Sequence, residues 1–165
     1  PAMMEFAFDN NQLATVLAHE FAHAIMTHPQ KTQQNATLGG LLGMAADTLA
    51  RSQGFDTGGS LSQLGAQSAV MRYSQGFERE ADYIGMYVLD RAGYNIHSAA
   101  YLWRRMASLN PDGIYNSSTH PTTAERYILL DKTSQEIVRK KSSGQPLLPE
   151  WLPEDNNSGF LGGLF

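Results

Sequence analysis

The sequence has no cysteine among its 165 residues. This absence excludes a disulfide scaffold, a thiolate metal site and a cysteine nucleophile, and it fits cytosol and periplasm equally well. Charge is also sparse, because only 17% of residues are charged and the formal net charge is −4. Without a block rich in Lys and Arg, the chain lacks the electrostatic footprint of a protein that binds nucleic acid or anionic lipid. We therefore expect no nucleic-acid partner.

Long apolar runs are missing as well. The longest notable uncharged run lies between Lys31 and Asp47, whereas a membrane-spanning helix needs about twenty mostly apolar residues. Residues 1–5 show neither a basic n-region nor an apolar h-region, so the sequence predicts no signal peptide at this end. The hydrophobic content of 42% is typical of a globular domain. We interpret residues 38–49 as a core or interface helix rather than a membrane anchor.

Hydrophobic spacing predicts a mainly α-helical domain with little strand. Apolar residues recur every three or four positions from Leu13 to Ile25, which predicts an amphipathic helix ending near His28-Pro29. Further helices are predicted at residues 38–51, 60–74 and 75–92, from residue 97 or 98, and after Pro121, with a polar linker at 30–37, a Gly-rich break at 55–59 and a short strand at 4–8.

The same spacing predicts which side chains face the core and where the domain ends. In the helix predicted at 60–74 the expected inward residues are Leu61, Leu64, Ala69 and Val70. In the last helix they are Ile128, Leu129, Ile137 and Val138. Residues 1–141 are predicted to form one domain. Residues 142–165 are rich in Pro and Gly and lack periodicity, so we expect an extended or disordered tail.

The first predicted helix carries the pattern HExxH at residues 19–23. Positions i and i+4 of a helix share a face, so both imidazoles can approach one metal ion at about 2.0–2.1 Å. Glu20 lies about 100° further around the axis, where it can take a proton from metal-bound water. The alternative is a helix that merely bears two surface histidines, His19 and His23.

Two histidines need a third protein ligand. The remaining histidines are His28, His97 and His120. In the strongest downstream helix, Glu78 and Asp82 are four apart and share a face, whereas Glu80 points roughly the opposite way. A glutamate on a metal, with an aspartate one turn later that binds the free N–H of a ligand histidine, is a common arrangement. The alternative is a solvated face whose charges form surface ion pairs.

Together these segments resemble the M48 family of zinc metallopeptidases. The resemblance rests on HExxH at 19–23, on the ExxxD pattern that begins at Glu78, and on an HPxxxxR element at 120–126. It implies a zincin-like (gluzincin) fold and one Zn²⁺ per chain held by His19, His23 and Glu78. It further implies that Glu20 is the general base and acid and that Asp82 orients a histidine.

Members of this family usually have strands before the HExxH helix, and this chain has only eighteen residues there. Two interpretations follow: the N-terminal strands are missing, or Met4–Phe8 is the last of them. His28 does not fit a metzincin site, which would need Gly and His where the chain has Met26 and Pro29. We interpret His28 as a helix-C-terminal histidine stabilised by the helix dipole rather than as a ligand.

The sequence thus predicts a zinc endopeptidase with a polypeptide substrate. The resemblance implies a role in the quality control of misfolded or misassembled membrane and envelope proteins, and a periplasmic or membrane-associated location. Two other hypotheses remain: a chaperone-like or binding module with a plugged or inactive zinc site, and a closed structural zinc site. His120 is a candidate for the active-site cleft, either as a donor to the oxyanion or as a fourth zinc ligand.

Overall fold

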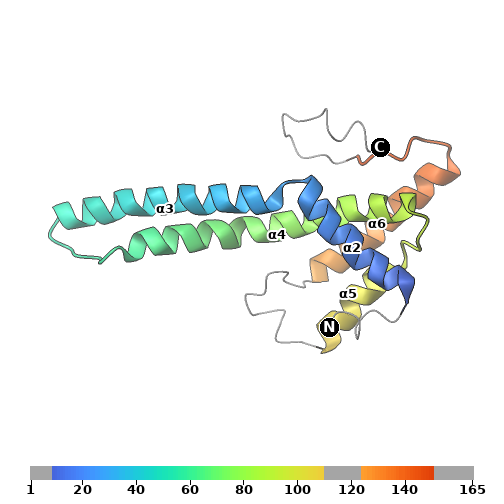
Figure 1. Ribbon diagram of the computed structural model, residues 1–165, viewed down its shortest axis with the longest axis horizontal. Coiled ribbons are helices and arrows are strands. Elements are labelled where there is room, and N and C mark those ends of the chain that lie inside the picture. Colours follow the sequence, from blue (N-terminus) through green and yellow to red (C-terminus); the bar gives the residue numbers. More distant parts are fainter. Residues whose placement is uncertain (1–8, 110–123, 151–165) are drawn as a thin grey trace.

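The computed structural model describes residues 9–109 and 124–150, which fold into helices joined by short loops (Figure 1). The helices are α2 (Asn10–Ile25), α3 (His28–Ser52), α4 (Ser60–Arg91), α5 (Ser98–Leu109) and α6 (Ala124–Ser142). No strand occurs among the described residues, which confirms the mainly α-helical prediction. The short strand predicted at 4–8 lies outside the described residues.

The junction between α2 and α3 differs from the sequence prediction. Helix α2 begins after Asp9, whose carboxylate accepts the Gln12 N–H at 2.9 Å, and it ends at Ile25. Thr27 then adopts a left-handed conformation with φ of 55°, and α3 begins directly at His28. The predicted linker at 30–37 is therefore wrong, since these residues are helical. Pro29 lies in the first turn of α3, where its missing N–H costs nothing.

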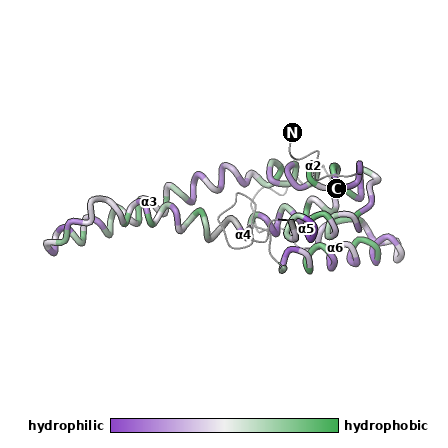
Figure 2. Tube along the Cα trace, turned by 90° about the horizontal axis from the view of Figure 1, so that it is seen from below, coloured by the Kyte–Doolittle hydropathy of each residue, from purple (hydrophilic) through white to green (hydrophobic). Residues whose placement is uncertain are grey.

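Helices α3 and α4 form a long antiparallel hairpin held by close backbone contact. A Cβ atom built on Gly43 would lie 2.1 Å from the Leu61 carbonyl oxygen, and one on Gly39 would lie 2.4 Å from that of Gly65. Only glycine permits this approach. Because Gly65 faces α3, Leu64 points outward and is 59% exposed, so its predicted burial is wrong. Figure 2 shows the hairpin projecting from the rest of the molecule.

The hairpin turn is fastened by Asp47 of α3. Its carboxylate accepts the N–H groups of Leu61 and Ser62 at 3.2 and 2.9 Å and the hydroxyl of Thr57. Gly59, at the N-cap of α4, has no side chain for this task, so Asp47 caps α4 from the neighbouring helix. The loop at residues 53–59 confirms the predicted Gly-rich break.

Helix α4 runs without interruption from Ser60 to Arg91. The prediction of two helices that meet near residue 74 is therefore wrong. No proline interrupts this stretch, and α3 packs along its first part while α2 and α6 pack along its second. Gly93, with φ of 79°, follows the C-terminus as predicted.

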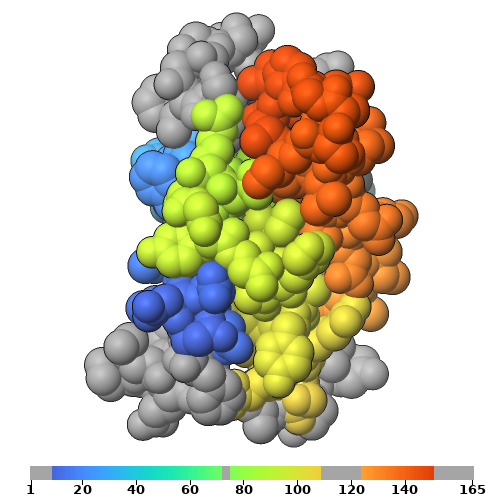
Figure 3. Space-filling model, turned by 90° about the vertical axis from the view of Figure 1, so that its right-hand side faces the viewer, coloured from blue at the N-terminus to red at the C-terminus, as the bar shows by residue number. Residues whose placement is uncertain are grey.

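The core lies where α2, α5 and α6 surround the C-terminal half of α4. Its buried side chains include Ala22, Met26, Ile84, Tyr87, Leu89, Trp103, Leu130 and Ile137. Figure 3 shows α6 lying along this half of α4, with α2 and α5 on the same face of the molecule. Ile128 and Val138 were predicted to be buried, but they are 56% and 47% exposed, because Leu130 and Ile137 occupy the side of α6 that faces α4.

Residues 143–150 follow α6 without forming a helix or strand. Lys140 donates from Nζ to the Leu148 carbonyl, and the Glu150 N–H donates to the Tyr83 hydroxyl at 2.7 Å. These contacts tie residues 143–150 to the domain. In the described part of the chain, no helix combines the length and apolar character required to span a bilayer.

Candidate metal centre

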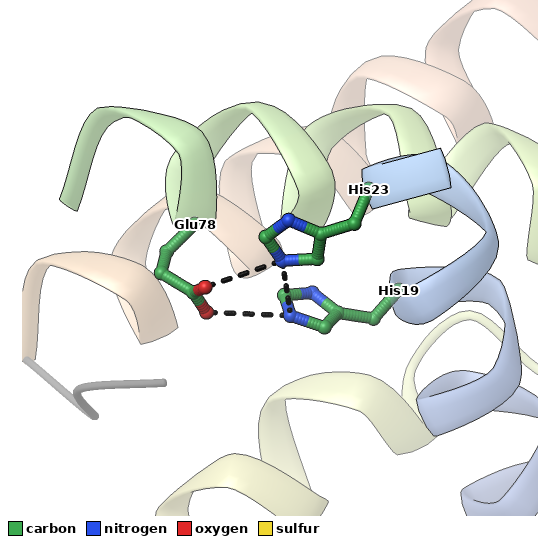
Figure 4. Close-up of side chains that lie close together, drawn as sticks. All are labelled: His19, His23 and Glu78. Atoms are coloured by element: carbon green, nitrogen blue, oxygen red, sulfur yellow. Dashed lines mark hydrogen bonds and ion pairs between the residues drawn. The ribbon is translucent and has the colours of Figure 1, made fainter. Parts of the chain in front are cut away.

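Three side chains from two helices converge at the centre of the fold (Figure 4). His19 and His23 are one turn apart on α2, and their Nε2 atoms are 3.1 Å apart. Glu78 faces them from α4, with Oε2 at 3.3 Å from His19 Nε2 and Oε1 at 3.2 Å from His23 Nε2. The structure therefore brings together the three residues that the sequence analysis proposed as ligands.

The spacing of these donor atoms fits a small tetrahedral ion. Zinc bonds of about 2.0–2.1 Å place neighbouring ligand atoms about 3.3 Å apart along each edge of a tetrahedron. The two Nε2 atoms are 3.1 Å apart, and they lie 3.3 and 3.2 Å from different oxygens of Glu78, so each of these separations is close to that edge length. Two imidazole nitrogens and one carboxylate are also donors that zinc prefers. His19 and Glu78 are each 2% exposed, so the group can hold a metal ion in a largely buried position.

Asp82 connects the outer nitrogen of His19 to a buried arginine. His19 Nδ1 lies 3.0 Å from Asp82 Oδ1, which is the contact that the ExxxD pattern predicts. Arg126 of α6 donates to Asp82 from Nε at 2.6 Å and from Nη2 at 2.9 Å, and its Nη1 lies 2.9 Å from Glu78 Oε2. The sequence placed Arg126 in a motif but did not reveal this bridge.

Burial and the neighbouring carboxylates shift the pKa values of His19 and Arg126 in opposite directions. Burial lowers the pKa of His19, but the contacts with Asp82 and Glu78 raise it by more, so the net pKa lies above the ordinary value. Burial likewise lowers the pKa of Arg126, and the two carboxylates raise it overall, which keeps the guanidinium charged. Arg126 also lies over the Trp103 ring, 4.7 Å from its centre.

A second buried pair lies beside His23 and was missed by the sequence analysis. His28 Nδ1 is 2.8 Å from His23 Nδ1, and His28 Nε2 is 3.0 Å from Glu80 Oε2. The interpretation of His28 as a helix-C-terminal histidine is wrong, because His28 begins α3 instead of ending α2. Glu80 does point away from Glu78, as predicted, but that direction leads to His28 rather than to solvent.

Of the two remaining predicted site residues, Glu20 and His120, the structure describes only Glu20. Glu20 follows His19 on α2 and is exposed, so its carboxylate borders solvent next to the buried histidine. His120 lies outside the described residues.

Comparisons with known proteins agree with this geometry. Residues 2–134 match the sequence profile of the family described as peptidase family M48. The chain is 30% identical over 132 residues to the mitochondrial metalloendopeptidase OMA1 of Saccharomyces cerevisiae, which covers 76% of this chain and 37% of that protein. It is 31% identical over 112 residues to the beta-barrel assembly-enhancing protease of Yersinia pestis. That match covers 64% of this chain and 23% of the protease.

A further relative is the OMA1 metalloendopeptidase of Schizosaccharomyces pombe, at 30% identity over 147 residues, with 86% of this chain and 36% of that protein covered. The chain thus spans well under half the length of these relatives. No solved structure matches the chain significantly.

Proposed function

The chain belongs to peptidase family M48, and we propose that it forms the catalytic core of a zinc-dependent endopeptidase. The observation that carries the proposal is the convergence of the His19, His23 and Glu78 donor atoms, at separations suited to ligands of one zinc ion. We propose that these three residues hold one Zn²⁺ per chain and leave the fourth position open. An open position distinguishes a catalytic zinc site from a structural one.

In this proposal zinc, when bound, polarises the scissile carbonyl and lowers the pKa of its water towards about 7. The Glu20 carboxylate accepts the proton of the attacking water and then passes it to the leaving amine. Asp82 Oδ1 lies 3.0 Å from His19 Nδ1, where it can accept the Nδ1–H and so direct the Nε2 lone pair of that ring toward the metal position. Arg126 holds Asp82 in place and balances its charge.

His120 has two proposed roles at the same cleft. It either donates to the oxyanion that develops opposite Glu20, which is the role we favour, or binds zinc at the fourth position in the resting enzyme. Replacing His120 with Ala slows turnover in the first case and accelerates it in the second. If His120 instead packs against the last helix, the variant loses stability and keeps its turnover per folded molecule.

The proposed substrates are polypeptides, and more narrowly misfolded or misassembled membrane and envelope proteins. Support comes from the names of two relatives, a mitochondrial metalloendopeptidase and a protease that enhances beta-barrel assembly. With this substrate class we propose a periplasmic or membrane-associated location.

Cleavage of an unfolded protein tests the activity. The purified chain is incubated with casein alone, with a zinc chelator, and with zinc restored after chelation. We expect cleavage that the chelator abolishes and zinc restores. Zinc binding without cleavage would contradict the proposal and favour the alternative, a chaperone-like module with a plugged or inactive zinc site.

A further inference from the structure

We propose that His28 and Glu80 form a relay that positions His23 for the metal, as Asp82 does for His19. This inference rests on the zinc site proposed above. It makes His28 a positioning residue, because its imidazole contacts a ligand histidine and would not touch the metal or the substrate. The two ligand histidines of α2 would then be supported from different directions, His19 by α4 and α6 and His23 by α3 and α4.

The proton positions follow from the contacts. A metal on Nε2 of His23 leaves the proton of that ring on Nδ1. Nδ1 of His23 lies 2.8 Å from Nδ1 of His28, so the latter nitrogen must accept and can carry no proton. The proton of His28 is then on Nε2, which lies 3.0 Å from Glu80 Oε2 and donates to it. The chain His23–His28–Glu80 has one consistent arrangement of protons.

The surroundings hold His28 in that orientation. Its ring stacks on Phe77, with the ring centres 4.5 Å apart and the planes 18° apart. His28 is 2% exposed and Glu80 is 5% exposed, so water cannot readily replace either partner.

The geometry also separates this role from direct metal binding. His28 Nδ1 faces the nitrogen of His23 that points away from the metal position, and its Nε2 is engaged by Glu80. The group of described residues whose ligand atoms converge contains His19, His23 and Glu78 and does not include His28. His28 therefore acts on the metal through His23.

Two substitutions distinguish the relay from simple packing. His28→Phe preserves a ring that can stack on Phe77 but removes the acceptor for His23. His28→Asn loses the stacking ring but retains an oxygen near the position of Nδ1. If the relay positions His23, zinc affinity measured by chelator competition falls about 10- to 100-fold in His28→Phe and partly recovers in His28→Asn. If His28 only packs, the order reverses, with His28→Phe close to wild type.

The exposed His97 offers a matched control, since His97→Phe and His97→Asn remove a histidine far from this contact chain. We expect wild-type zinc affinity in both. Visible spectra of the Co²⁺-substituted proteins give a readout that does not depend on activity. His28→Phe should alter the metal absorption bands, and the His97 variants should leave them unchanged.

Ring-nitrogen NMR of the zinc-loaded Glu20→Gln protein tests the relay even if a His28 variant fails to fold. We expect the proton of His23 on Nδ1 and that of His28 on Nε2. A proton on Nδ1 of His28, or wild-type zinc affinity in folded His28→Phe, would overturn the relay. A wild-type chain that binds no zinc would instead overturn the proposed site itself.

Discussion

Arg126 of α6 and Asp82 of α4 form a two-pronged ion pair in the interior, with N–O distances of 2.6 and 2.9 Å and each residue only 2% exposed. Removing one partner of a buried pair leaves the other charge uncompensated. Because Arg126 also contacts Glu78, its loss leaves both carboxylates without the cation that they share. The pair thus joins the stability of the fold to the geometry of the proposed metal centre.

We predict that Arg126→Met lowers the free energy of unfolding of the metal-free protein by about 3–5 kcal/mol. Zinc should restore part of the loss, because a bound cation offsets the charge of Glu78. Urea unfolding with and without zinc measures both effects. Arg104→Met is the control, since Arg104 pairs with Asp131 at the surface and should contribute no more than about 1 kcal/mol. Equal losses in the two variants would contradict this prediction.

Glu20→Gln should retain zinc and lose nearly all hydrolysis. The amide cannot accept the proton of the attacking water, whereas Glu20 is not among the residues whose donor atoms converge. Casein cleavage and metal analysis of the same sample check both parts. Glu125→Gln, which changes an exposed glutamate on α6, should leave both unchanged. Near-normal cleavage by Glu20→Gln would remove Glu20 from its proposed role.

The double variant His23→Ala, Glu78→Ala should bind almost no zinc, because a single histidine remains of the three converging ligands. The wild-type protein should contain about one zinc per chain. Metal analysis after dialysis against a weak chelator compares them. Full retention of zinc by the double variant would show that the metal is bound elsewhere.

Gly43→Ala should destabilise the α3–α4 hairpin, by about 1–3 kcal/mol, because the added methyl group meets the Leu61 backbone. Gly40→Ala is a matched control three residues earlier on α3, where the nearest atom would lie at 3.8 Å. That control should be neutral or stabilising by up to about 1 kcal/mol, since Ala favours a helix. Thermal unfolding followed by circular dichroism measures both. Similar melting temperatures in the two variants would argue against the close packing.

Asp47→Asn should lower the melting temperature at neutral pH and have little effect in acid. The hydroxyl of Thr57 and the N–H groups of Ser62 and Leu61 hold the pKa of Asp47 below its ordinary value of 3.8. A carboxylate with a lowered pKa stabilises the fold above its unfolded-state pKa, and this contribution is lost as the pH falls through the folded-state pKa.

Melting temperatures of the two proteins between pH 7 and pH 2 should therefore converge below about pH 4. Asp56→Asn is the control at the same end of the hairpin, since Asp56 is exposed, accepts the Gly58 N–H, and lies 3.9 Å from Arg51 at the surface. A constant difference between wild type and Asp47→Asn across the whole pH range would contradict the ionic origin of the cap.

The sequence revealed the centre of the site better than its surroundings. The spacing of His19 and His23 defines a helix face by itself, and Glu78 with Asp82 repeats the same spacing on a second helix. The His28–Glu80 contact joins residues fifty-two positions apart through the start of α3. In the sequence, Pro29 predicts the end of a helix, although a proline can equally occupy the first turn of the next one, as it does here.

The packing of α3 against α4 could not be predicted from the sequence for a different reason. Residues 30–37 are polar, and the face of α4 that meets α3 includes Gly65 and Ala69, so the large apolar Leu64 is a poor guide to the buried side of this helix. Leu64 was expected inside for this reason and lies outside. Periodicity identifies a buried face by its large apolar residues, and it fails where glycine forms the contact.

The junction of α2 with the hairpin has a mechanical consequence. His19 and His23 belong to α2, whereas Glu78 and Glu80 belong to α4, and His28 begins α3 after a turn of two residues. The hairpin and α2 thus contribute different ligands to one proposed site, and an ion held there would link the two. Because Glu78 lies on the same uninterrupted helix as one arm of the hairpin, a change in the angle between α4 and α2 would change the separations of these donor atoms.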